Sequence, residues 1–187
     1  MALWGASDAD ESKPKWLTTA EKKTVLATTA GWVHEAWNAD MGNDNTSAQV
    51  EVLACVGGLA VKIGAATITS VDLVTTEWKV DEGGTLTTLV RWNEAVDVVE
   101  VGSGLKMNVE NDSRANLTLR YASGTGTNEL TFTLVIAAAN SAIQAGDVLS
   151  IPEEDLVKAG ATSVKDAGTS TVSEIAITAA QGTAAGT

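Results

Sequence analysis

Leu130-Thr131-Phe132-Thr133-Leu134-Val135-Ile136 begins with a strict alternation of large apolar and polar side chains. In an extended chain, successive side chains point to opposite faces of a sheet, so this stretch predicts a strand with one buried face. An earlier stretch, Leu117-Thr118-Leu119-Arg120-Tyr121, has the same period of two. Together the two segments favour an all-β fold.

Further segments of this kind are separated by turns rich in Gly, Asn and Asp, which favour tight changes of chain direction. β-branched residues dominate them, and no apolar stripe of helical period persists. The other segments expected as strands are residues 50–56, 68–75, 85–92, 96–101, 105–109, 148–151 and 175–177. This rhythm over residues 67–178 predicts an antiparallel β-sandwich.

Residues 1–48 do not follow this rhythm. Thr18 and Glu21 have the spacing of a capping box, which predicts a short helical turn. Residues 31–37 could alternate as a strand, and the segment after them is a polar loop. The expected organisation is an extended N-terminal arm over 1–48, a connecting strand region over 49–66, the sandwich over 67–178 and a flexible tail over 179–187.

Four of the six tryptophans lie in the expected arm: Trp4, Trp16, Trp32 and Trp37. Indole side chains are large, costly to leave in water, and frequent anchors of protein interfaces. They could pack back on their own domain or dock on a neighbouring subunit. We favour docking, which makes these four the candidate partner-binding residues.

The formal net charge of −12 argues against nucleic acid as a partner, because phosphate would be repelled. No apolar stretch approaches the length of a membrane span, so we expect no membrane partner. A signal peptide has a long apolar stretch near its N-terminus, whereas this sequence has Asp8 and Asp10 there. We therefore expect the product to be cytosolic at synthesis.

The residue types needed for catalysis are scarce. His34 is the only histidine and Cys55 the only cysteine, so the chain offers neither a nucleophile with its base nor a zinc ligand set. Cys55 is expected as a small buried apolar residue. The acidic runs 8–11 and 153–155 could attract Ca²⁺, but they lack EF-hand spacing, and solvated surface is the favoured interpretation. We therefore expect no enzyme, no cofactor and no metal site.

Two stretches within residues 67–178 resemble bacterial immunoglobulin-like repeats. They are Gly83-Gly84-Thr85-Leu86 with Val90-Arg91-Trp92-Asn93-Glu94-Ala95-Val96, and the tyrosine, Gly-rich turn and strand of residues 121–132. Those repeats are adhesive or surface-layer modules without catalytic residues. The resemblance implies an immunoglobulin-like antiparallel sandwich.

The N-terminal motifs Leu3-Trp4-Gly5, Pro14-Lys15 and Gly31-Trp32-Val33 resemble the opening of small virion proteins of marine tailed phages, especially cyanophages. That resemblance implies a structural protein of the virion, assembled in the host cytoplasm. With an immunoglobulin-like domain, it favours a capsid decoration or cement protein that binds the major capsid protein and copies of itself as a multi-copy or homo-oligomeric assembly. The alternatives are a receptor- or carbohydrate-binding module on a head or tail fibre, with Trp78 or Trp92 facing the ligand, and a tail-tube or neck component.

Overall fold

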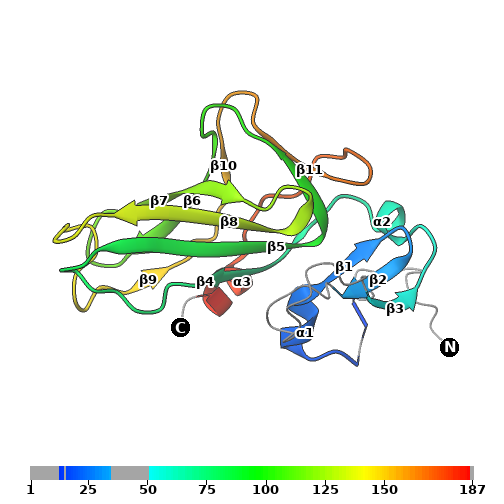
Figure 1. Ribbon diagram of the computed structural model, residues 1–187, viewed down its shortest axis with the longest axis horizontal. Coiled ribbons are helices and arrows are strands. Elements are labelled where there is room, and N and C mark those ends of the chain that lie inside the picture. Colours follow the sequence, from blue (N-terminus) through cyan, green and yellow to red (C-terminus); the bar gives the residue numbers. More distant parts are fainter. Residues whose placement is uncertain (1–12, 15, 35–50, 186–187) are drawn as a thin grey trace.

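The computed structural model describes residues 13–14, 16–34 and 51–185 (Figure 1). The part described is all-β: its eleven strands form one mixed sheet, and its helices are short. No helix in the described ranges is long and apolar enough to cross a bilayer. In chain order the elements are α1 (Thr19–Thr24), β1 (Val25–Thr28), β2 (Gly31–His34), β3 (Glu51–Cys55), α2 (Leu59–Lys62), β4 (Ile68–Leu73), β5 (Gly84–Val99), β6 (Leu105–Asn111), β7 (Leu117–Ser123), β8 (Thr127–Ile136), β9 (Leu149–Ser150), β10 (Val157–Lys158), β11 (Ser163–Asp166) and α3 (Ala179–Ala185).

Figure 1 shows these elements in two groups. Each group has its own cluster of buried apolar residues. We call residues 16–34 and 51–63, with α1, α2 and β1 to β3, the N-terminal unit. We call residues 66–185, with β4 to β11 and α3, the β body. The larger cluster fills the β body, and the smaller one lies within the N-terminal unit.

The β body is organised around β5. This strand pairs antiparallel with β4 along one edge and with β8 along the other, and β7 and β6 continue the sheet beyond β8. Its C-terminal end then pairs with β11. The inward side of β5 is mostly apolar, and Trp92, fully buried, donates its indole N–H to the carbonyl of Glu174 at 2.9 Å. β5 is thus the strand on which the rest of the body is assembled.

β5 differs from the expectation of two separate strands over 85–92 and 96–101. The polar residues Asn93 and Glu94 fall between the two expected strands, yet both are buried and the strand continues through them. The amide of Asn93 donates to the carbonyl of Thr67 at 3.0 Å, and Glu94 pairs with Ala27 of β1. The strand therefore changes partners here without ending.

The N-terminal unit replaces the expected extended arm over residues 16–34. The capping box is confirmed, with Thr18 and Glu21 bonded in both directions at the start of α1. β1 and β2 form an antiparallel hairpin, and β2 pairs onward with β3. A β-carbon added at Gly31, where φ is +135°, would lie 1.9 Å from the carbonyl oxygen of Ala54, so only glycine permits this approach. Short segments far apart in the sequence thus bury one another.

The C-terminal expectations also differ from the structure. Residues 179–185 form α3 where a flexible tail was expected, and Gln181 donates its side-chain amide to the carbonyl of Ile68 at 2.6 Å. Small residues allow this packing, because a β-carbon at Gly182 would meet the Ile151 carbonyl oxygen at 2.4 Å. The expected strand at 175–177 is reduced to one isolated bridge, between Asp155 and Ala176.

Candidate functional site

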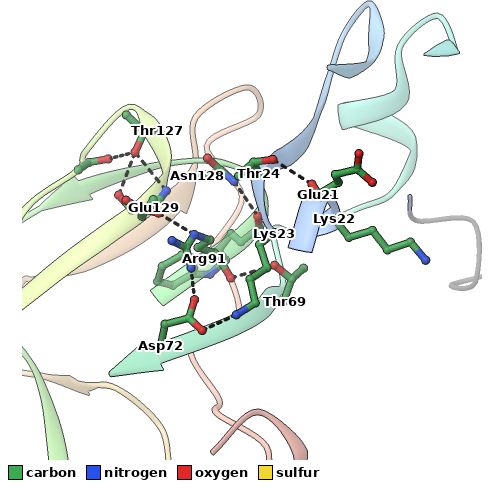
Figure 2. Close-up of polar contacts among 12 residues, drawn as sticks. Glu21, Lys22, Lys23, Thr24, Thr69, Asp72, Arg91, Thr127, Asn128 and Glu129 are labelled. Atoms are coloured by element: carbon green, nitrogen blue, oxygen red, sulfur yellow. Dashed lines mark hydrogen bonds and ion pairs between the residues drawn. The ribbon is translucent and has the colours of Figure 1, made fainter. Parts of the chain in front are cut away.

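A cluster of charged side chains joins the two units, and Asp72 of β4 lies at its centre (Figure 2). One carboxylate oxygen accepts from the ammonium of Lys23, on α1, at 2.5 Å. The other accepts from the guanidinium of Arg91, on β5. A single carboxylate therefore links the helix of the N-terminal unit to two strands of the β body. We call Lys23, Asp72, Arg91 and Glu129 the ionic junction.

Strand register explains how these groups meet. Asp72 lies opposite Leu89, two residues from Arg91 on the same face of β5, and Arg91 lies opposite Glu129 of β8. Neighbours of this kind can interact across a sheet. Arg91 Nε donates to Glu129 Oε2 at 2.6 Å, and the Arg91 side chain is only 10% exposed. A guanidinium this buried requires both carboxylates, since unpaired buried charge is strongly destabilising.

Lys13 extends the positive side of the junction. Its ammonium donates to the carbonyl of Lys22 at 2.5 Å. Burial, with smaller contributions from the positive charges of Arg91 and Lys22, lowers the pKa of Lys13 to about 8. The segment before α1 is therefore electrostatically coupled to β5.

A second feature lies close to the junction along β5. Glu94 and Asp166 are both 1% exposed. Burial, followed by the negative charge of Asp166, raises the pKa of Glu94 to about 8. Glu94 is also where β1 pairs with β5, through the single register pair with Ala27. The contact between the two units therefore includes a buried acid as well as the ionic junction.

The candidate partner-binding tryptophans are placed differently from one another. Trp16 is 64% exposed just before α1. Trp32 is fully buried in the cluster of the N-terminal unit, with Val25 and Leu59, which favours the interpretation that it packs on its own chain. Trp4 and Trp37 lie outside the described residues. The structure does not bring the candidates together into one described surface.

The other singled-out residues show no reactive arrangement. His34 is buried, and its Nε2 lies 2.8 Å from the hydroxyl of Thr24. Cys55 is exposed, contrary to the expected burial, because β3 ends the sheet and only β2 flanks it in the described ranges. Within those ranges, no group of three or more His, Cys, Asp or Glu is placed to hold a metal ion.

A shallow pocket of about 530 Å³ lies at the other end of the β body. Residues 113–117 and 140–142 line it, and these loops adjoin the end of β5 where Gly84 pairs with Ile136. Arg114 at its rim donates to Asp147 at 2.8 Å. Its remaining polar lining is made of serine and asparagine.

The ionic junction and the buried acid were not found by sequence reasoning. Lys23 and Asp72 are 49 residues apart, so no local motif links them. Glu94 offers one signal, a carboxylate at an inward position of an alternating segment, but it falls between the two strands expected over 85–92 and 96–101. The chain matches no protein-family model, no curated protein and no solved structure.

Proposed function

We propose that this protein is a structural component of a phage particle, a capsid decoration or cement protein that binds the outer shell through its N-terminal region. The observation that carries the proposal is the exposed indole of Trp16 just before α1. Trp anchors contribute most to binding when they are held in place before the partner arrives. The capping box orders the start of α1, and the Lys23–Asp72 pair links α1 to the β body.

The same proposal takes the β body as an immunoglobulin-like sandwich. Its support is the antiparallel order β4-β5-β8-β7-β6 and the passage of β5 from that sheet to β11. Such a body presents loops at both ends. It would project from the shell while the N-terminal unit faces it. Many copies on one particle compensate for modest affinity at each site.

Binding to shells tests the proposal. Purified chain is mixed with particles that lack it, and the bound fraction is measured by co-sedimentation. Trp16→Ala is expected to weaken binding at least tenfold, since loss of a central Trp anchor costs about 2 kcal/mol or more. Val135→Ala is the matched control, because Val135 is 76% exposed on β8 of the β body and should leave binding unchanged. Equal binding by both variants and the parent chain would contradict the proposal.

A second candidate function is favoured by the pocket beside Arg114. Its serine and asparagine side chains suit a ligand rich in hydroxyl groups, such as the glycan bound by a fibre module. A glycan array separates the two functions. Decoration predicts no bound sugar, whereas a carbohydrate-binding module predicts signal that Asn116→Ala removes.

A further inference from the structure

Glu94 carries a buried carboxyl group on β5. Both of its oxygens are shielded from solvent, and neither meets a donor among the described residues. A carboxylate in such a position loses its hydration without replacement, which is among the most costly arrangements in a folded protein. Its environment therefore favours the neutral, protonated form.

Asp166 is the acid nearest to it in the strand register. Asp166 lies opposite Val96, and Glu94 is two residues from Val96 on the same inward face of β5. The amide of Ala167 donates to the carbonyl of Ala95 at 3.0 Å and continues the pairing of β11 toward Glu94. Diagonal neighbours at this spacing are within reach of a long side chain.

The two acids are not equivalent. Asp166 accepts from the amide of Gly168 at 2.7 Å and from the hydroxyl of Thr169 at 2.8 Å. Donors of this kind favour the charged form of a carboxylate. Glu94 has no such donors among the described residues. The proton of the pair is therefore placed on Glu94, whose pKa is raised by burial and then by the negative charge of Asp166.

Other ionisable groups near this point do not neutralise Glu94. β1 carries none, and β8 contributes the neutral Thr127 and Asn128 beside this part of β5. Lys165 and Asp97 oppose each other on the outward side of the β11–β5 pair. Glu174 is exposed, and Arg91 is engaged by Asp72 and Glu129.

At this part of β5, β1 of the N-terminal unit is held by fewer register pairs than β11. β11 is joined to β5 by four register pairs, whereas β1 is joined to it by the single pair of Ala27 with Glu94. A charged Glu94 must reach water, and the boundary with fewest bonds is the one that opens at least cost. We propose that Glu94 and Asp166 form a proton-holding latch, and that loss of its proton releases the N-terminal unit from β5.

The raised pKa of Glu94 sets the direction in which the stability of the closed form depends on pH. The pKa of Glu94 rises from the ordinary 4.5 to about 8 in the closed form. The closed form therefore binds more protons than the open form between these values, and it weakens as pH rises through that window. The contribution is complete below pH 4.5 and is lost once the pH passes about 8. Above that, both forms are ionised and the dependence levels off.

Amide hydrogen exchange across this pH range tests the latch in the full chain. Protection factors, corrected for intrinsic exchange, are expected to fall about tenfold per pH unit in residues 25–34 between about pH 5.5 and 7.5. Glu94→Gln, which mimics the protonated acid, should make these factors independent of pH. Asp97→Asn is the matched control, an exposed acid on the same strand that should behave like the parent chain.

Asp166→Asn provides a second variant if Glu94→Gln does not fold. It removes the opposing charge, so the fall in protection should be smaller and should level off at lower pH. An equal pH dependence in Glu94→Gln or in Asp166→Asn would overturn the proposal. So would loss of protection in residues 163–170 in place of 25–34. Restored protection at pH 9 on adding millimolar Ca²⁺ would also overturn it, because the acids would then be a cation site.

Discussion

At the scale of single residues, the side chain of Asp72 connects the N-terminal unit to the β body. Its carboxylate accepts from both Lys23 and Arg91, and it is 25% exposed. Asp72→Asn keeps the shape and removes the charge, which leaves the guanidinium of Arg91 with Glu129 alone. We expect a loss of about 1–3 kcal/mol in the free energy of unfolding, measured by urea denaturation.

Glu82→Gln is the control for that change. Glu82 pairs with Lys79 at 3.3 Å. The Lys79 side chain is 71% exposed and the Glu82 side chain 68%. An ion pair in water contributes little, so unfolding should change by less than about 1 kcal/mol. If the two substitutions had the same effect, the buried position of the junction would not matter and our interpretation would be wrong.

At the scale of elements, the capping box of α1 was predicted correctly because its signal is local. Thr18 and Glu21 are three residues apart, and the amide of Glu21 donates to the Thr18 hydroxyl at 3.3 Å. Thr18→Ala should therefore reduce stability by about 1 kcal/mol, measured by thermal unfolding. Thr19→Ala, one residue further into the helix, should have a smaller effect, and the reverse order would contradict the role of the cap.

The strands also divide into those predicted from a local pattern and those that depend on distant partners. β6 to β8 were anticipated because their side chains largely alternate between a buried and a more exposed face, and β4 was anticipated from its β-branched residues. β1, β10 and β11 were missed because they are two to four residues long and depend on partners remote in sequence. The continuity of β5 through Asn93 and Glu94 was missed because buried polar residues look like a turn until their partners are known.

At the scale of the whole molecule, the all-β character was predictable from alternation and turn residues, whereas the arrangement in two units was not. The N-terminal unit is built from segments on either side of residues 35–50, and its core depends on Trp32 and Leu59, which no local pattern joins. Contacts of this kind arise from packing between distant segments. The same limit applies to the junction, whose four charged residues lie in α1, β4, β5 and β8.

The central claim of the proposed function is that the N-terminal unit faces a capsid shell and the β body projects from it. Cryo-electron microscopy of phage particles to which the purified chain has been added tests the claim most directly. We predict density on the outer shell into which the β body fits, with Trp16 and α1 directed at the capsid surface and the Arg114 pocket directed away. Particles whose shell lacks this density, or density in which the β body contacts the capsid while α1 points outward, would contradict it.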